Sequence, residues 1–376
     1  MQIEHLAKRI GVSRLADVTG LDHVGLPVVA AIRPLSRNLT VSFGKGLTRE
    51  IARLSAVMEA AELYFSERPP SPLVCATHRA LRRGTAIDPG NFEQIEPCDI
   101  STRQFNWIDA RVLNSGQPIL VPWETVSMDF TAESRKEKRV LGFGATGLAA
   151  DFNESRAVLH GLYEVIERDA HNAWNRASDE QRAETLVDLG SLRAPAVLSL
   201  LDRIDAANLE LLLWDITGKA EVSCYIAEVF DLASSTPTAF VQGAAADLSA
   251  HAAILKAISE ALQVRLTYIA GSRDDLEWSD YGSRYDHVVA NRFWVKNNLL
   301  ARRKVPVPAA EPYQSEQALA ELSRRLESGS PHPVVIVRLT SADDPVKVVK
   351  VIVPSFSDVQ EIETLRPTED FSHEIF

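Results

Sequence analysis

The sequence predicts an α+β fold in which mixed sheets pack with helices, arranged as one domain over residues 1–376. Three observations support this prediction. Apolar stretches typical of strands and amphipathic stretches typical of helices follow one another in no regular βαβ order. No repeat, low-complexity tract or linker divides the chain. The 376 residues, 45% hydrophobic and 24% charged, are enough for a large buried core.

Strands are predicted where short apolar or alternating runs are bounded by turn residues. These runs are at residues 24–34, 39–43, 105–112, 119–123, 209–216, 222–230, 240–246, 334–339 and 346–353. The second run closes on Gly44-Lys45-Gly46, which does not have the spacing of a phosphate-binding P-loop, whose lysine directly precedes Ser or Thr.

Helices are predicted where apolar residues recur every three or four positions. They are expected within residues 1–20, from Thr48 to the prolines after Arg68, and at residues 161–174, 192–206, 252–269 and 316–326. Thr48 is expected to be an N-cap. Residues 76–100 and the charge run at 135–139 are expected to be mainly loops. Residues 276–304 are rich in aromatic and basic side chains.

Three of the predicted helices each carry two oxygen-bearing side chains three residues apart, and so on one side of the helix. The pairs are Glu59 with Glu62, Glu164 with Glu167, and Glu260 with Gln263. Acids close together near a core need a cation or a hydrogen-bond donor. Hard oxygen ligands suit Mg²⁺, which joins carboxylates to substrate phosphates, so the pairs predict one shared site. The alternative is a set of structural salt bridges, with Arg168 and Arg265 pairing with Glu164 and Glu260.

Other candidate site residues are Lys45, Ser55 and Arg273. The glycines beside Lys45 allow a ligand to approach closely, Ser55 lies one turn before Glu59, and Arg273 follows the third acidic helix in a position to clamp a phosphate. Each also has a structural interpretation, as a surface lysine, a hydroxyl bonded to its own helix and a partner of Asp274. The histidines do not cluster at metal-ligand spacing, and His160 and His171 are interpreted as structural. Residues 142–147 match Gly-x-Gly-x-x-Gly but are interpreted as a turn, because no βαβ unit surrounds them.

Composition excludes several classes of function. The net charge of −11 argues against a broad nucleic-acid surface. No signal-peptide core or long apolar run indicates secretion or a membrane span. Three scattered cysteines indicate a reduced, cytoplasmic protein rather than a disulfide framework.

Taken together, these motifs resemble the YcaO-domain family over nearly the whole chain. The segments that carry the resemblance are Asp-Val-Thr-Gly-Leu-Asp at 17–22 with Gly-Leu-Pro-Val at 25–28, Ser-Phe-Gly-Lys-Gly at 42–46 with residues 55–62, Gly-Leu-Ala-Ala at 147–150 with Glu-Val-Ile-Glu-Arg-Asp at 164–169, Glu-Ala-Leu-Gln-Val-Arg at 260–265 with Gly-Ser-Arg-Asp-Asp at 271–275, and residues 348–354. The resemblance implies a YcaO-like fold with ATP held through Mg²⁺ among acidic helices.

The resemblance also implies the chemistry. Family members activate a backbone amide of a ribosomally made peptide: a nucleophile adds to the carbonyl carbon, and the oxygen is phosphorylated by ATP and leaves as phosphate. A Cys, Ser or Thr side chain then gives an azoline, and an external sulfur donor gives a thioamide. A separate peptide-binding or TfuA-like partner and a homodimer are expected.

By position, the resemblance assigns the metal and phosphate cage to Glu59, Glu62, Glu164, Glu167 and Glu260. It assigns supporting contacts to Lys45, Ser55, Arg168, Gln263, Arg265 and Arg273, with Glu167, Arg168 and Arg273 closest to the chemistry.

The chain departs from the family pattern in three places. The part before Asp17, about residues 1–16, is shorter than in many members. Phe152 and Arg156 stand where the family usually has a small or polar residue and an acid. Residues 369–376 are not the proline-rich end of azoline-forming members. The first two departures motivate an alternative, a degenerate member that binds nucleotide or a partner without turnover, and the third weakens the azoline-forming interpretation.

Overall fold

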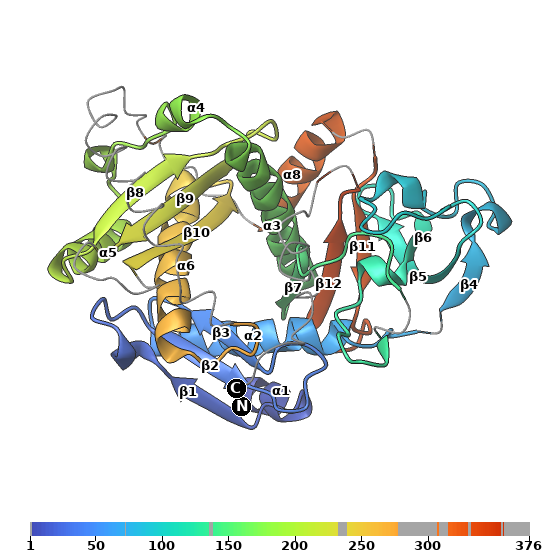
Figure 1. The fold of residues 1–376 in the computed structure, drawn as a ribbon, viewed down its shortest axis with the longest axis horizontal. Helices are drawn as coiled ribbons and strands as arrows, with labels where there is room; N and C mark the ends of the chain where they lie inside the picture. The colour runs from blue at the N-terminus through green and yellow to red at the C-terminus, as the bar shows by residue number, and fades with distance from the viewer. Residues whose placement is uncertain are drawn as a thin grey trace, which may run out of the picture.

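The computed structural model describes residues 2–71, 73–134, 138–231, 239–276, 307, 315–329, 332–354 and 356. The C-terminal octapeptide and, apart from Leu276 itself, the aromatic and basic segment at 276–304 lie outside these residues. The described elements form three antiparallel sheets packed with helices, which confirms the predicted α+β fold (Figure 1).

The first sheet lies in the N-terminal part of the chain. Its order is β1 (Arg14–Asp17), β2 (Val28–Ile32) and β3 (Val41–Lys45). Helices α1 (Gln2–Arg9) and α2 (Arg49–Ser66) accompany it. Thr48 caps α2, because its side chain accepts a hydrogen bond from the Ile51 amide, as the sequence predicts.

The largest sheet combines strands from the middle and the end of the chain. Along the sheet the order is β4 (Val74–Thr77), β5 (Gln104–Val112), β11 (Val335–Arg338), β12 (Lys347–Ile352) and β7 (Leu148–Asp151), and β6 (Pro118–Pro122) pairs with β5. Helix α3 (Glu154–Asn175) packs against β12 and β7, and α8 (Ser315–Gly329) packs against α3. The sheet therefore joins the last strands of the chain to the strand that precedes the central helix.

The third sheet has the order β10 (Phe240–Asp247), β9 (Ser223–Phe230) and β8 (Glu210–Asp215). Helix α6 (Ala250–Ala270) packs along β10 and β9, α5 (Pro195–Ala206) packs against β8 and α6, and the short α4 (Asp179–Ala183) follows α3. Ser249 caps α6, and Gly271 ends it in the left-handed conformation.

Two glycines let strands approach the acidic helices closely. A Cβ on Gly44 of β3 would lie 1.9 Å from the Ala56 amide of α2, and one on Gly243 of β10 would lie 2.2 Å from the Ala261 amide of α6. The facing helix positions are alanines, so the backbones meet without intervening side chains. Each acidic helix is therefore set firmly on its sheet, which fixes the direction in which its carboxylates project.

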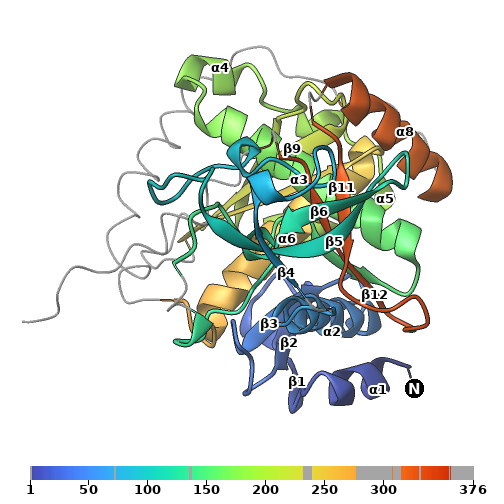
Figure 2. The same ribbon diagram turned by 90° about the vertical axis from the view of Figure 1, so that its right-hand side faces the viewer.

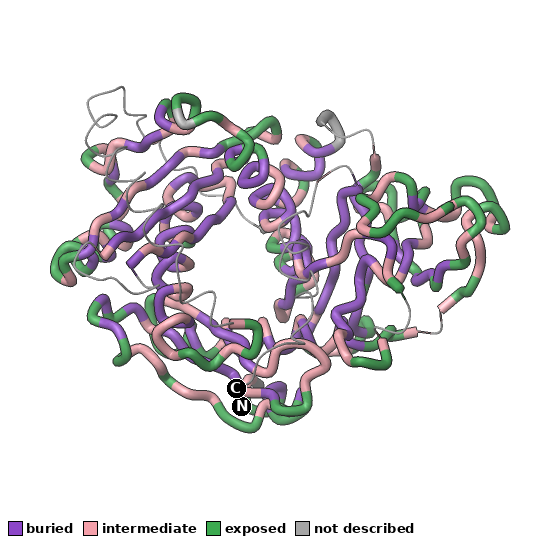
Figure 3. The backbone as a smooth tube through the Cα atoms, viewed as in Figure 1, coloured by how far each residue is buried: buried purple, intermediate pink, exposed green. Residues whose placement is uncertain are grey.

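Helices α2, α3 and α6 lie around the middle of the molecule in Figure 1, with α6 on the left, α2 below and α3 on the right. Figure 2 looks along α2 and shows it beneath α3. In Figure 3 the sheets and these helices are largely buried, whereas many exposed residues lie in the peripheral loops.

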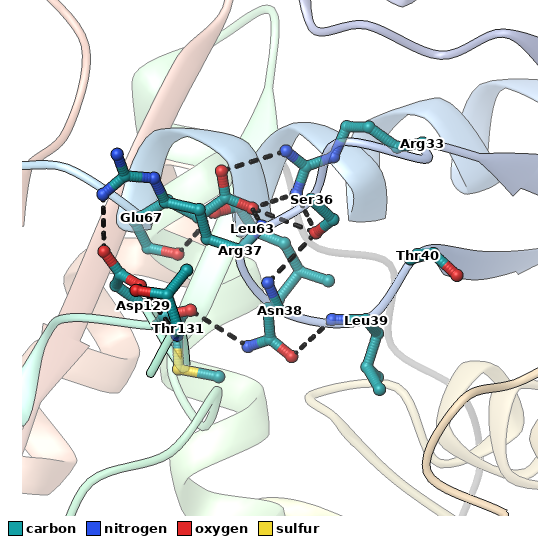
Figure 4. Close-up of polar contacts among 12 residues, drawn as sticks. Arg33, Ser36, Arg37, Asn38, Leu39, Thr40, Leu63, Glu67, Asp129 and Thr131 are labelled. Carbon is teal, nitrogen blue, oxygen red and sulfur yellow. Dashed lines mark hydrogen bonds and ion pairs between the residues drawn. The ribbon is translucent and has the colours of Figure 1, made fainter. Parts of the chain in front are cut away.

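A buried ion pair anchors the loop between β2 and β3 to the end of α2 (Figure 4). Both Arg33 and Glu67 are 3% exposed, and Arg33 donates to both carboxylate oxygens of Glu67. Ser36 and the Arg37 amide also donate to Glu67, each at 3.0 Å. These donors satisfy the buried carboxylate and hold residues 33–40 in place.

The predicted strand and helix patterns are found, with shifted ends. The predicted strand at 24–34 shortens to β2, and the helix predicted at 161–174 begins seven residues earlier, at Glu154. Three short strands, β1, β4 and β7, were not predicted. With four residues each, they are too short for a periodic pattern, and pairing with neighbouring strands defines them.

Candidate functional site

The structure brings the predicted carboxylates of α2, α3 and α6 together. We call Glu59, Glu62, Glu164, Glu167 and Glu260 the acidic cluster. The charge of Glu59 raises the pKa of Glu62, as does that of Glu164, so α2 faces α3. The charge of Glu260 raises the pKa of Glu59 and of Glu167, so α6 faces both other helices. These effects require short distances between side chains up to about 200 residues apart in the chain.

Burial and mutual repulsion make it energetically unfavourable for the carboxylates of the cluster to be ionised. Burial is the main cause that raises the pKa of Glu59 to about 7, with Lys45 and Arg273 acting in the opposite direction. Burial also raises the pKa of Glu62 and Glu167 well above the usual range, and neighbouring carboxylates add to it. Ionised carboxylates gathered in this way attract a multivalent cation.

Two members of the cluster are fixed by backbone amides. Glu62 Oε1 accepts a hydrogen bond of 2.8 Å from the Ala150 amide, and Glu164 Oε2 accepts one of 3.1 Å from the Gly147 amide. Both donors lie where the chain enters or runs along β7, so this short strand orients one glutamate from each of two helices.

Gly147 is required where it stands. Its φ is +80°, a conformation that only glycine adopts readily, and a Cβ there would lie 2.2 Å from the Val351 carbonyl oxygen of β12. Residues 142–147 form the loop that leads into β7, and the third glycine of the Gly-x-Gly-x-x-Gly match supplies the amide that holds Glu164. That glycine orients a carboxylate of the acidic cluster.

Three predicted cations lie at the cluster. Lys45 Nζ is 3.4 Å from Glu260 Oε2, and Arg168 Nε is 3.8 Å from Glu167 Oε1. The charge of Arg273 lowers the pKa of Glu59, and its guanidinium forms a bidentate pair with Asp275. Ser55 and Gln263 are half-buried on α2 and α6, one turn from Glu59 and Glu260.

Arg265 has different partners from those expected. Its guanidinium is 3.1 Å from Asp22 and 3.2 Å from Asp231, and its side chain is 7% exposed. The structural alternative in which it pairs with Glu260 is therefore wrong, since Lys45 makes that pair. Arg265 lies about 140° around α6 from Glu260, and it joins the segment around Asp22 to the end of β9. Its predicted role in cofactor binding gains no support from these contacts.

Phe152 and Arg156 occupy ordinary structural positions. Phe152 packs against the core formed by α2 and the large sheet. Arg156 donates twice to Asp151 Oδ1, at 2.9 and 2.7 Å, so its charge is balanced locally. Glu154, out of register with the family pattern, pairs with Arg338.

Two histidines share the face of α3 that carries Glu164 and Glu167. His160, Glu164, Glu167 and His171 follow one another at steps of four, three and four residues, so their side chains lie within one narrow stripe. His160 is the exposed end of this stripe. The interpretation of both histidines as structural stays a prediction; the structure adds that both lie on the face of α3 that carries the two glutamates.

His171 is buried, at 7% exposure, and neither ring nitrogen has a hydrogen-bonding partner among the described residues. Burial lowers the pKa of His171 to about 4, and the nearby charge of Arg168 adds to this effect. His171 is therefore a neutral imidazole beside the cluster.

The acidic cluster fits a metal that takes further ligands from a bound molecule. Among the described residues, no group of three or more His, Cys, Asp or Glu side chains is close enough to hold a metal by itself. Mg²⁺ commonly binds through one or two carboxylates and completes its shell with phosphate oxygens and water. The fixed carboxylate pairs, with cations beside them, suit a Mg²⁺-bound polyphosphate.

A cavity of about 70 Å³ lies beside Arg168 rather than among the carboxylates. Its walls come from β12, α3 and the loops around Phe92 and Gly142, and include the buried Lys350.

Across the described residues, none of the helices is long and apolar enough to span a bilayer.

An α+β fold with carboxylates converging from three helices fits the class of magnesium- and nucleotide-binding proteins. A family model described as "YcaO cyclodehydratase, ATP- and Mg²⁺-binding" matches residues 43–357. The chain therefore belongs to the YcaO family, and the predicted cofactors, ATP and Mg²⁺, are those of the family.

Relatives and solved structures agree with this assignment. An uncharacterized protein in the tfuA 3′ region of Rhizobium leguminosarum bv. trifolii is 33% identical over 355 residues, covering 92% of this chain and 83% of the relative. An uncharacterized protein of Methanothermobacter thermautotrophicus is 30% identical, covering 92% of this chain and 89% of the relative.

Two solved structures share the fold. YcaO from Methanopyrus kandleri, bound with AMPPCP and Mg²⁺, has a TM-score of 0.68 and 21% identity, covering 95% of this chain and 89% of that chain. A heterocyclase in complex with substrate and cofactor has a TM-score of 0.74 and 18% identity, covering 94% of this chain. The present chain spans about half of that heterocyclase, 52% of its length.

Proposed function

We propose that this protein uses Mg·ATP to phosphorylate a backbone amide oxygen of a ribosomally synthesised peptide, so that a nucleophile replaces the oxygen. The observation that carries the proposal is the convergence of five carboxylates from α2, α3 and α6, with Lys45, Arg168 and Arg273 beside them. Family membership supports the same chemistry.

The residues of the site divide the work between metal binding and charge neutralisation. Glu59 and Glu62 on α2, Glu164 and Glu167 on α3, and Glu260 on α6 would hold Mg²⁺. The amides of Ala150 and Gly147 keep two of these carboxylates oriented before the ligand binds. Such preorganisation lowers the cost of reaching the reactive geometry.

The cations would contact the phosphates. Lys45, Arg168 and Arg273 each lie beside a carboxylate, so a phosphate that enters the cluster meets positive charge next to three of the five proposed metal ligands. When bound, Mg·ATP supplies the phosphoryl group that turns the amide oxygen, a very poor leaving group, into a good one. The protein positions the partners and neutralises the phosphate charge.

We propose that the product is a thioamide or an azoline. A TfuA-like partner and thioamide formation are supported by the relative in the tfuA 3′ region, which is 33% identical to this chain over 355 residues. Azoline formation is supported by the cyclodehydratase description of the family. Mass spectrometry separates the two products, because loss of water marks a ring and exchange of oxygen for sulfur marks a thioamide.

Phosphate release tests the proposal. Purified protein is given Mg·ATP with candidate peptide, with and without sulfide and a TfuA-like partner. Glu167→Gln should abolish release while leaving the protein folded, and Glu316→Gln, an exposed substitution on α8, is the matched control. Normal turnover by the Glu167 variant would show that the cluster is not the site of the reaction.

The alternative is a member that binds nucleotide without turnover, motivated by Phe152 and Arg156. Asp151 neutralises the charge of Arg156, so the arginine at this position is a weaker argument for lost ATP turnover than the sequence indicates. Tight binding of Mg·ATP without hydrolysis under every partner combination would favour this alternative.

Two further features belong to the proposal. The three cysteines, Cys75, Cys98 and Cys224, are free, which supports a reducing compartment such as the cytoplasm. A homodimer remains a prediction, which light scattering of the purified protein would test.

A further inference from the structure

The loop that follows α6 carries Arg273, one of the two cations whose charges lower the pKa of Glu59. Helix α6 ends at Gly271, whose amide donates to the Thr267 carbonyl oxygen, and the chain then turns away from the helix axis. Within the loop, Arg273 pairs with Asp275, and the Leu276 amide donates to the Arg273 carbonyl oxygen. These contacts are local, so they do not fix the loop relative to α2.

Asp274 makes the contact that fixes the loop relative to α2. Its carboxylate accepts the Thr40 amide at 3.2 Å on Oδ1 and 3.1 Å on Oδ2, and the Thr40 hydroxyl at 2.7 Å on Oδ1. The two residues are 234 positions apart in the chain. In the part of the chain that the structure describes, these are the hydrogen bonds that join residues 272–276 to a distant segment. Two donors of one residue, the amide and the hydroxyl of Thr40, make a directional, charge-assisted contact with the carboxylate.

Thr40 is itself fixed from both sides. Its carbonyl oxygen accepts the Arg33 amide at 2.7 Å, and Arg33 is held by the buried pair with Glu67 at the end of α2 (Figure 4). On the other side, Thr40 directly precedes β3, the strand that carries Lys45. The contact with Asp274 therefore ties the Arg273 loop to the same rigid unit that carries Glu59 and Lys45.

We infer that Asp274 and Thr40 are positioning residues, which hold the loop after α6 so that Arg273 faces Glu59 in the nucleotide site. This inference rests on the proposed function, because it gives the hydrogen bonds their purpose. A free arginine on an untied loop would lose conformational freedom on binding a phosphate, and the contact removes part of that cost in advance.

The first test measures the dissociation constant of Mg·ATP by calorimetry. Asp274→Ala and Thr40→Val should each weaken binding, the aspartate variant by about three- to tenfold, in line with the net worth of an ordinary protein hydrogen bond. Thr40→Ser keeps both donors and should bind as the wild type does. Asp343→Ala removes an exposed loop aspartate elsewhere and is the matched control.

The second test separates positioning from general stability. In an Arg273→Gln background, Asp274→Ala should cause no further loss of affinity, because the residue it positions has been removed. Undiminished additivity of the two substitutions would overturn the inference. If the wild type fails to bind Mg·ATP at all, the proposed function fails instead.

A readout that needs no nucleotide covers that case. Hydrogen exchange of the amides at 272–276 should accelerate in Asp274→Ala relative to the wild type, while exchange in α2 stays unchanged. Equal exchange rates in the two proteins would show that the contact does not hold the loop, and would overturn the inference whatever the nucleotide does.

Discussion

Replacing Glu59 by glutamine should stabilise the ligand-free protein while impairing its nucleotide binding. Glu59 is half-buried on α2, and burial together with Glu260 raises its pKa from 4.5 to about 7. Because the native state holds this proton more tightly than the unfolded state does, the stability associated with it is present below pH 4.5 and is lost as the pH rises through about 7. Glutamine cannot ionise and keeps a similar shape.

The shift gives the size of the effect. At about 1.36 kcal/mol per pH unit, the difference between 4.5 and about 7 corresponds to about 3 kcal/mol above pH 8. Because the Glu59 side chain retains solvent contact, we expect about half of this free energy to be realised. Glu59→Gln should therefore raise the free energy of unfolding by about 1–2 kcal/mol at pH 8.5. At pH 5 the gain should be well under half of that.

Urea unfolding of both proteins at pH 5 and pH 8.5 measures this difference. Glu50→Gln is the control on the same helix: Glu50 is fully exposed, and its pKa is lowered by its helix-end hydrogen bonds, so its substitution should change stability in the opposite direction at high pH. Calorimetry should show that Glu59→Gln weakens Mg·ATP binding. A Glu59 variant that is equally or less stable at pH 8.5, or whose gain is the same at both pH values, would refute the electrostatic reasoning.

Three other outcomes follow from the contacts. Gly147→Ala should lower the free energy of unfolding by at least about 2 kcal/mol, measured in urea, because the Cβ meets the Val351 carbonyl oxygen and the Glu164 hydrogen bond is lost; an unchanged transition would contradict this. Arg265→Leu should cost about 3–5 kcal/mol because Asp22 and Asp231 lose their partner, with little effect on the Mg·ATP affinity of the folded fraction; a selective loss of affinity would instead restore its predicted binding role. Chelation of Mg²⁺ should weaken ATP binding at least about a hundredfold, since the acidic cluster repels an uncompensated triphosphate, and calorimetry with and without EDTA would detect any metal-independent binding.

Much of the site could be predicted because its signal is local. Each pair, such as Glu164 and Glu167, lies on one helix at a spacing that puts both carboxylates on one side, and the surrounding alanines and leucines show that this side approaches a core. Thr48 was predicted as a cap for the same reason, since capping depends on residues within one turn.

The remaining features carry no local signal. The amides of Ala150 and Gly147 orient two glutamates, but every residue except proline has such a donor, so residue type does not mark it. The short strand β7 forms because β12 pairs with it, and that pairing is decided about 200 residues later in the chain.

The sequence alone determined the composition of the site: paired carboxylates on helices set against small residues, with lysine and arginine at the helix and strand ends. The tertiary structure decided which charges meet. Arg265 pairs with Asp22 and Asp231 rather than with Glu260, and Asp274 reaches Thr40 across the chain. The reason is physical. Helical periodicity follows from bonded geometry within a few residues, whereas the partner of a charge depends on how whole sheets and helices pack.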